Sequence, residues 1–461
     1  MDFYRVKKVE KVSAPDGVIT KPLREIWKGF SLKQSTLVLD NVVDEFVFRA
    51  GECKAPTLNQ GDEYAINIEE NGYCIVATDK FSLIRGVMTL MMRMQNNPTA
   101  EVLDIVIACG EIHGNFCVKE RTIHVMCPTN AFDFRRFIRF CALIQYKILV
   151  VEFRNNFGFK CLPKGMVTKK AISKRKLKKL FKEGNDLGLQ IVPMFNSLGH
   201  ASGYGEEHGE HALLDVDVKY QPLYSPNGWC FNVENPKVID LLNAIRKELC
   251  ELVDQSQFEK KYYHLGFDEA YLYRKKYLPP EKVASFMRTL TDQVVADGYI
   301  PFVWGDMLLN KEMIPEYDKD AGVYYCAQCE HPYDLLKGLN PKTIICDWQY
   351  SVNKAPVVTT AHLKEKGYNV YGSAWGGTSW FTGRNVTAHV DMVKQGKSDG
   401  IMMTTWGVTK RYDEVLFCAY ECGLPHNTWS KYSQPSTVVA TFYRNLLPAK
   451  GNFKKAGHLS K

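Results

Sequence analysis

Continuous apolar runs, separated by segments of helical periodicity, extend along the chain from residue 121 to residue 406. The eight runs that we predict to be strands cover residues 121–127, 146–153, 189–196, 261–267, 299–306, 343–348, 368–375 and 400–406. Runs with few polar interruptions are typical of parallel strands that are covered on both faces. Helix-like segments lie between them, for example at residues 131–145 and 235–255. Eight strand–helix units predict a (β/α)8 TIM barrel, whereas six or seven would indicate an open doubly wound sheet.

The first part of the chain follows a different pattern. Its strand-like segments and one helical stripe cover residues 35–40, 44–50, 63–79, 81–95 and 103–112. The step Glu69-Glu70-Asn71-Gly72 between two apolar runs indicates a hairpin turn. We therefore predict an α/β protein with a small α+β N-terminal domain at residues 1–118, followed at residues 119–461 by the (β/α)8 barrel and a short C-terminal tail.

Composition and charge exclude several classes of protein. The chain is 45% hydrophobic and 24% charged, and its net charge of +8 is modest for 461 residues. No basic block is interleaved with aromatic residues, so we expect no nucleic-acid partner. No stretch approaches the roughly 18 apolar residues of a membrane span, and the start of the chain lacks the apolar core of a signal peptide. We therefore expect no membrane association and a cytoplasmic location.

Two segments could suggest other functions. The lysine-rich residues 173–188 could form a helix that lies on a membrane or binds phosphate, but we interpret them as an outer barrel helix with a solvated basic face. Fourteen cysteines are scattered without a disulfide framework, as expected in a reducing compartment. Cys326 and Cys329 form one CxxC pair near His331, but no second pair has metal-binding spacing. We interpret these two cysteines as ordinary thiols and predict no metal site.

Acidic and aromatic residues gather at the predicted carboxyl ends of the strands, where (β/α)8 barrels carry their functional residues. Asp268 and Glu269 are adjacent at the end of the fourth run. Tryptophans stand at four later strand ends: Trp304, Trp348, Trp375 and Trp406. Indole faces stack on the CH faces of a sugar ring, while carboxylates meet its hydroxyls and its glycosidic oxygen. The pattern favours a sugar pocket over tryptophans that only fill the rim of the barrel.

Several short motifs occur in an order found in one enzyme family. They are Glu120-Arg121 at the first strand, IVPMFNSLGHA at 191–201, YHLGFDE at 263–269, Trp304-Gly305-Asp306-Met307 and Thr405-Trp406-Gly407. These motifs resemble those of the family-20 glycoside hydrolases, the β-N-acetylhexosaminidases. In particular, YHLGFDE is similar to the family signature His-x-Gly-Gly-Asp-Glu, and residues 63–95 resemble part of the family's N-terminal domain.

The resemblance implies a retaining exo-β-N-acetylhexosaminidase, which removes terminal β-linked GlcNAc or GalNAc from an oligosaccharide or glycoconjugate. In this family the 2-acetamido oxygen of the substrate attacks C1 and forms an oxazolinium intermediate, so no cofactor is expected. By this resemblance, Glu269 is the general acid and base, and Asp268 orients the acetamido group. Ordinary retaining glycosidases use two carboxylates about 5 Å apart, an arrangement that neighbouring residues with diverging side chains do not easily provide.

The other matches imply a set of substrate-binding residues. Arg121 would donate hydrogen bonds to the sugar hydroxyls, with an ion pair at the bottom of the barrel as its alternative reading. His200 would support the acid pair, or would be a structural histidine. The remaining candidates wall the acetamido pocket, cap the acetamido oxygen or reach the distal hydroxyls: Trp304, Trp348, Trp406, Tyr350, Tyr371 and Asp413 (or Glu414).

Departures from the family pattern leave questions open. Phe267 replaces the second glycine of the signature, and Leu198 replaces a proline in the third-strand motif. Asn196 stands where many members carry aspartate, and Gly407-Val408 follow Trp406 where a glutamate is usual. The preference for GlcNAc or GalNAc and the oligomeric state therefore stay open.

Two alternative functions follow from the same residues. The first is a non-catalytic sugar-binding relative that has kept the pocket. The second is a barrel glycosidase that uses two distant carboxylates, Glu269 with Glu152 or Asp347.

Overall fold

The computed structural model describes most of the chain, and all structural statements below concern its described part. That part comprises residues 2–97, 99–154, 156–164, 167, 169–201, 217–226, 228–270, 280–309, 335–375, 383–406, 412–425 and 446.

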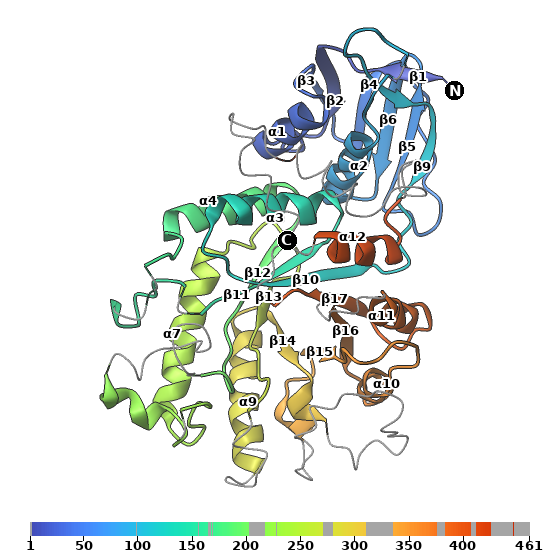
Figure 1. Cartoon of the computed structure of the whole chain (residues 1–461). Helices are drawn as coiled ribbons and strands as arrows, with labels where there is room; N and C mark the ends of the chain where they lie inside the picture. The colour runs from blue at the N-terminus through green and yellow to red at the C-terminus, as the bar shows by residue number, and fades with distance from the viewer. Residues whose placement is uncertain are drawn as a thin grey trace.

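Two sheets and two helices form the first part of the chain, which lies against one end of the barrel (Figure 1). One sheet has the strand order β3-β2-β4-β6-β5-β9 and the other β1-β8-β7. The strands are β1 (Phe3–Arg5), β2 (Val9–Ala14), β3 (Thr36–Val42), β4 (Val47–Gly51), β5 (Tyr64–Glu69), β6 (Gly72–Ala77), β7 (Gln95–Asn96), β8 (Ile105–Ala108) and β9 (Gly110–His113), and the helices are α1 (Lys21–Phe30) and α2 (Lys80–Met92). The predicted hairpin is confirmed, since β5 and β6 pair antiparallel with Glu69 opposite Gly72.

Eight parallel strands close into a barrel, which confirms the predicted (β/α)8 fold. The strands are β10 (Glu120–Met126), β11 (Ile148–Glu152), β12 (Gln190–Met194), β13 (Tyr262–His264), β14 (Ile300–Trp304), β15 (Ile344–Trp348), β16 (Asn369–Trp375) and β17 (Gly400–Thr404). The helices are α3 (Ala131–Leu143), α4 (Lys174–Asp186), α7 (Pro236–Leu252), α9 (Pro280–Ala296), α10 (Val358–Glu365), α11 (Arg384–Lys394) and α12 (Tyr412–Glu421), and the short 3-10 helices are η2 (Val218–Leu223), η3 (Asp306–Leu308) and η6 (Leu335–Gly338).

Alternate side chains of the barrel strands pack in two separate clusters. One cluster, which includes Val150, Met194 and Phe302, fills the inside of the barrel. The other includes the neighbouring residues on the same strands, such as Val151, and lies between the strands and the helices. Because strand side chains alternate between faces, the parity of a residue decides whether it points into the barrel. At the carboxyl ends, this parity decides which residues reach the mouth.

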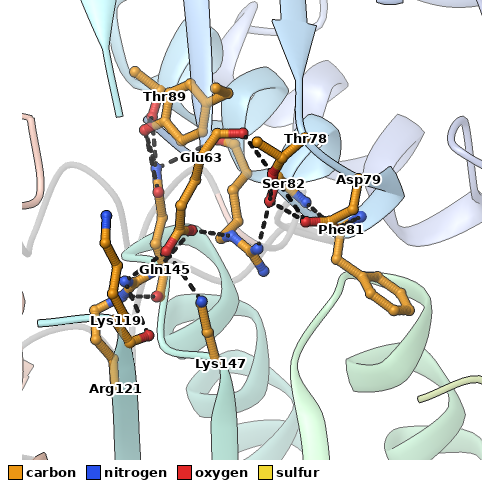
Figure 2. Close-up of polar contacts among 12 residues, drawn as sticks. Glu63, Thr78, Asp79, Phe81, Ser82, Thr89, Lys119, Arg121, Gln145 and Lys147 are labelled. Carbon is orange, nitrogen blue, oxygen red and sulfur yellow. Dashed lines mark hydrogen bonds and ion pairs between the residues drawn. The ribbon is translucent and has the colours of Figure 1, made fainter. Parts of the chain in front are cut away.

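A buried charged cluster joins the N-terminal domain to the barrel (Figure 2). The carboxylate of Glu63 accepts hydrogen bonds from both terminal nitrogens of Arg121 and from Nε of Arg85, each at 3.0 Å. Nζ of Lys147 also lies 3.0 Å from Oε1 of Glu63. Burial raises the pKa of Glu63, but the three cations outweigh it and hold this pKa well below its usual range.

The position of Arg121 corrects one sequence prediction. Arg121 lies at the start of β10, whereas Asp268 follows the end of β13, so the two residues lie at opposite ends of the barrel. Its guanidinium also donates to the backbone oxygens of Gln145 and Val118. The predicted contact of Arg121 with substrate is therefore wrong, and the alternative, an ion pair at the bottom of the barrel, is the observed arrangement.

Other segments can be compared with their predictions. Within the basic segment, α4 buries Leu177, Leu180 and Phe181 and leaves most of its lysines exposed, as interpreted for an outer barrel helix. Among the described helices, none is long and apolar enough to cross a membrane. The described residues contain no group of three or more His, Cys, Asp or Glu that could hold a metal ion. The CxxC pair, Cys326 and Cys329, and the nearby His331 lie outside the described residues.

Candidate active site

The acid pair lies in a tight turn at the carboxyl end of β13, which we call the acid turn (residues 265–269). Gly266, Phe267 and Glu269 have φ angles of 73°, 76° and 48°, in the left-handed region. This region is unfavourable for residues with a side chain and is readily adopted by glycine. The family signature has glycine at the position of Phe267, and the backbone angle gives a physical reason for that preference.

Phe267 occupies this glycine-like position without entering the pocket. Its side chain is fully buried and belongs to the cluster between the strands and the helices, not to the cluster inside the barrel. Its backbone N–H donates to Oδ1 of Asn196 at 3.1 Å. The ring thus fills space behind the acid pair, and Asn196 holds the backbone of the turn.

The two carboxylates of the acid turn have different surroundings. Asp268 is 4% exposed, and its Oδ1 accepts a hydrogen bond from the side-chain amide of Asn196. The Glu269 side chain is 29% exposed, and its Oε2 lies 3.0 Å from Nε2 of His200. The same His200 nitrogen lies 3.5 Å from Oδ2 of Asp268. His200 therefore bridges an inner and an outer carboxylate.

Electrostatics shift the titration of this group. Burial raises the pKa of Asp268; the His200 ring and the Asn196 amide oppose this shift, whereas the carboxylates of Glu152 and Glu269 add to it, so the Asp268 pKa lies above its usual value. Burial lowers the pKa of His200, but Asp268 and Glu269 outweigh it, so the His200 pKa lies above its usual value. The Asp268 carboxylate thus favours the protonated form of His200, and the His200 ring favours the ionised form of Asp268.

The loop after β12 packs closely against the acid turn. A Cβ atom on Gly199 would lie 2.2 Å from the backbone oxygen of Asp268, so only glycine permits this approach. The next residue, His200, has a φ of 53° and reaches both carboxylates from this loop. The geometry of this loop therefore explains why the third-strand motif has glycine at position 199 and histidine at position 200.

The backbone of Glu269 is held on both sides by side chains from other segments. Its N–H donates to Oδ2 of Asp306 at 2.9 Å, and its carbonyl oxygen accepts from Nε1 of Trp229 at 2.7 Å. Oδ1 of Asp306 accepts from Nε1 of Trp348 at 3.2 Å. The Trp229 ring also packs on the His200 ring, with centroids 4.5 Å apart. The sequence motifs did not point to Trp229, because it lies in a loop without a recognisable pattern.

Aromatic side chains line the barrel beside the acid turn. Trp304 and Trp406 lie with ring centroids 5.6 Å apart, and Tyr350 stacks on Trp348 at 5.3 Å. The hydroxyl oxygen of Tyr350 accepts from Nε1 of Trp406 at 2.9 Å and from the hydroxyl of Thr404 at 3.1 Å. Burial raises the pKa of Tyr350, so this hydroxyl keeps its proton. The structure thus brings four predicted pocket residues together.

A second polar chain reaches the same end of the barrel from β10 and β11. Nε2 of His124 lies 2.9 Å from Oε2 of Glu152, and Arg154 donates to Oε1 of Glu152 from Nε and Nη2 at 3.0 and 2.9 Å. The His124 ring lies 4.9 Å from the ring of Trp406. Arg154 follows β11 at the same end of the barrel as the acid turn, and its charge lowers the pKa of His200. Strand parity could have found it, since Arg154 follows Glu152 by two positions.

Three other candidates do not meet at this site. Tyr371 is paired with Gly400, which is in turn paired with the first residue of β10, so Tyr371 lies near the amino end of the barrel and its predicted substrate contact is wrong. Asp347 accepts hydrogen bonds from the hydroxyls of Thr359 and Thr360, which lie on the outer helix α10.

The positions of Asp413 and Glu414 do not support their predicted contact with the distal hydroxyls of the sugar. Asp413 is exposed on the first turn of α12, and Glu414 beside it is buried. This helix packs through Tyr412 against Phe140 of α3, on the outside of the barrel. Gly407 and Val408 lie outside the described residues.

Part of the chain matches a known protein family. Residues 160–323 match the family model "Glycosyl hydrolase family 20, catalytic domain". The chain is similar to a lacto-N-biosidase of Bifidobacterium bifidum, with 22% identity over 297 residues, which are 57% of this chain and 24% of that protein. The chain thus spans about a quarter of the length of this curated relative.

Solved structures show the same fold. A chitobiase of Flavobacterium johnsoniae superimposes with a TM-score of 0.66 at 14% identity, covering 97% of this chain and 70% of the other. A β-N-acetylhexosaminidase of Bacteroides fragilis superimposes with a TM-score of 0.65 at 16% identity, covering 96% and 93%. The described part of the chain thus combines a closed (β/α)8 barrel with an acid pair and aromatic side chains at the carboxyl ends of its strands. Through the match at residues 160–323 and the shared fold, the barrel is similar to the catalytic domain of glycoside hydrolase family 20.

Proposed function

We propose that the protein is a retaining exo-β-N-acetylhexosaminidase that uses the acetamido group of its substrate as the nucleophile. The observation that carries this proposal is the different placement of two neighbouring carboxylates. Glu269 is partly exposed, as a group that exchanges protons with a leaving group and with water must be. Asp268 is buried beside the Asn196 amide, as a group that holds a substrate N–H inside the pocket must be.

The reaction follows from these two roles. The acetamido oxygen attacks C1 while Glu269 gives its proton to the glycosidic oxygen, and the C1–O bond breaks as the alcohol leaves. Asp268 accepts the acetamido N–H and stabilises the positive charge of the oxazolinium intermediate. Glu269 then takes a proton from the water that attacks C1, which opens the ring and retains the configuration. His200, bound to both carboxylates, limits their mutual repulsion.

The aromatic residues provide the pocket for the acetamido group. Trp304, Trp348 and Trp406 wall it, and Tyr350 caps its oxygen. The hydroxyl of Tyr350 already accepts two hydrogen bonds and keeps its own proton, so it is suited to donate to the acetamido oxygen. This donation holds the nucleophilic oxygen in place for its attack on C1.

We assign to Arg154 the task that the sequence suggested for Arg121. Its side chain is 15% exposed and is fixed by Glu152, so its guanidinium is pre-oriented at the mouth of the barrel. Guanidinium groups donate several hydrogen bonds in a fixed geometry, which suits neighbouring hydroxyls of a sugar ring. The family-like contact with the distal hydroxyls would thus come from the second barrel strand instead of the first.

Two alternative functions, a glycosidase with two distant carboxylates and a non-catalytic sugar-binding protein, are less well supported. A glycosidase with two distant carboxylates is not favoured with Asp347, which faces an outer helix, nor with Glu152, which is buried between His124 and Arg154. A non-catalytic sugar-binding protein would not need both members of the acid pair.

One assay separates these functions. The purified protein is offered the p-nitrophenyl β-glycosides of GlcNAc, GalNAc, glucose, galactose and lacto-N-biose, with and without a thiazoline mimic of the oxazoline. We expect release only from N-acetylhexosaminides, inhibition by the thiazoline, and a fall in kcat of about 100-fold or more in Asp268→Asn with an unchanged melting temperature. Equal hydrolysis of glucosides would overturn the proposal, and bound sugar without turnover would favour the binding protein.

A further inference from the structure

The general acid Glu269 stands on a strained stretch of backbone that its own strand does not fix. Its φ of 48° lies in the left-handed region, which is strained for a residue with a side chain and persists only where the surrounding structure holds it. Both polar groups of its backbone are engaged by side chains: Asp306 accepts from the N–H, and Trp229 donates to the carbonyl oxygen. The backbone position from which the Glu269 side chain points therefore depends on these two residues, while His200 contacts the carboxylate itself.

Asp306 makes a second contact that links the acid to the pocket wall. It is 3% exposed and stands directly after β14 at the start of η3. One of its carboxylate oxygens accepts from the Glu269 N–H, and the other accepts from Nε1 of Trp348. Only a group with two acceptor oxygens can hold both donors; an amide of the same shape offers one oxygen and an NH2 group.

We propose that Asp306, assisted by Trp229, is a positioning residue that sets the general acid Glu269 at a fixed distance from the Trp348 wall. This inference rests on the proposed function. Trp348 confines the acetamido group, whose oxygen attacks C1, while Glu269 protonates the glycosidic oxygen on the same carbon. The Asp306 carboxylate thus aligns the acid Glu269 with the acetamido group that attacks the same carbon. Trp229 prevents the acid turn from rotating away.

The dependence of the rate on the leaving group tests this role. The variant Asp306→Asn and the wild type are compared on 2,4-dinitrophenyl and phenyl β-N-acetylglucosaminides. Dinitrophenolate leaves without a proton, whereas phenolate needs the general acid, which contributes about 100- to 10,000-fold to such steps. We expect kcat to fall about 100-fold on the phenyl glycoside and less than about 5-fold on the dinitrophenyl glycoside. Trp229→Phe, which removes only the indole N–H contact, should show the same selectivity at about 10-fold.

Matched variants control for general effects on the fold. Asp399→Asn alters a carboxylate at the amino end of the barrel that likewise accepts a backbone N–H, from Val370 at 2.9 Å, and a side-chain donor, Lys364. Trp27→Phe removes a buried indole hydrogen bond to Ser35 in the N-terminal domain. Both controls should keep wild-type rates on both glycosides. Melting temperatures are measured for all four variants.

The outcomes separate this inference from the function on which it rests. An equal loss on both glycosides, or a change in KM alone, would mean that Asp306 supports the pocket or the fold and not the acid. If Asp306→Asn does not fold, a leaving-group-independent effect of Trp229→Phe would overturn the inference in the same way. A wild type without activity on any N-acetylhexosaminide would instead overturn the proposed function.

Discussion

Replacing Asn196 by aspartate tests how the buried carboxylate of Asp268 stays ionised. The side chain of Asn196 has two tasks. Its oxygen accepts from the backbone N–H of Phe267 at 3.1 Å and of Leu198 at 3.4 Å, and its NH2 group donates to Asp268. Aspartate can keep both acceptor contacts but loses the donor. The substitution restores the residue that many family members carry, yet it places a second carboxylate against Asp268.

The structure gives the size of the effect. Both positions are almost fully buried, so the lost hydrogen bond to a charged group is worth about 1.5–3 kcal/mol. Two unit charges about 4 Å apart at an effective dielectric constant of about 20 repel by about 4 kcal/mol, which corresponds to about three pKa units. Burial already raises the pKa of Asp268, and the second carboxylate would raise it further, so the new pair would hold a proton more tightly than Asp268 alone. We therefore expect kcat/KM at pH 7 to fall about 100-fold, which is about 2.7 kcal/mol.

The assay is the pH profile of kcat/KM on p-nitrophenyl N-acetyl-β-glucosaminide. Activity requires ionised Asp268, so the acidic limb of the profile should move upward by about two to three units in Asn196→Asp, and the profile should narrow. The control is Asn196→Ala, which removes the same donor without adding a charge, so its acidic limb should move upward by less than that of Asn196→Asp. An unshifted acidic limb with rates near those of the wild type in Asn196→Asp would refute the reasoning.

Two further predictions concern the domain junction and the mouth of the barrel. Glu63→Gln should lower the free energy of unfolding in urea by about 3–5 kcal/mol, because it leaves the buried Arg121 opposite no carboxylate. Since the folded-state pKa of Glu63 is lowered, its contribution is complete above the ordinary value of 4.5 and is lost as the pH falls toward the lowered pKa; a variant with the same acid sensitivity as the wild type would contradict this. Arg154→Lys keeps a positive charge beside Glu152 but loses the several hydrogen-bond donors that the guanidinium holds in a fixed geometry. It should therefore lower kcat/KM about 10-fold. This loss should shrink on substrates without the 3- or 4-hydroxyl, and an equal loss on all of them would rule out the contact.

The fold could be predicted from the sequence because its signal is repeated along the whole barrel. Each buried strand is a continuous apolar run, and eight such runs define a closed barrel even where individual boundaries are off. The fourth run, predicted at 261–267, is assigned as a strand only at Tyr262–His264, because the chain enters the left-handed acid turn at Gly266. Strand ends are therefore less predictable than strands.

The site residues show which physical information the sequence holds. Parity within a strand separates inner from outer side chains, and it would have excluded Asp347 next to the inward-pointing Trp348 and selected Arg154 two positions after Glu152. The position of a residue along the barrel axis depends on how the strands are staggered relative to one another, and this stagger cannot be read from the sequence. For this reason the predicted contact of Tyr371 was wrong. A loop residue such as Trp229 becomes visible only once the chain is folded.

Two departures from the family pattern form a single structural unit at this site. Phe267 takes a glycine-like conformation that must be held from outside, and Asn196 holds it by accepting its N–H. The same Asn196 side chain turns its amide toward Asp268, so an amide serves both contacts where a carboxylate would serve one. His200 has Asp268 and Glu269 as its charge partners, since its Nε2 lies within 3.5 Å of both carboxylates. The two departures, at 196 and 267, are therefore in direct contact, through a hydrogen bond that an aspartate at 196 could also accept.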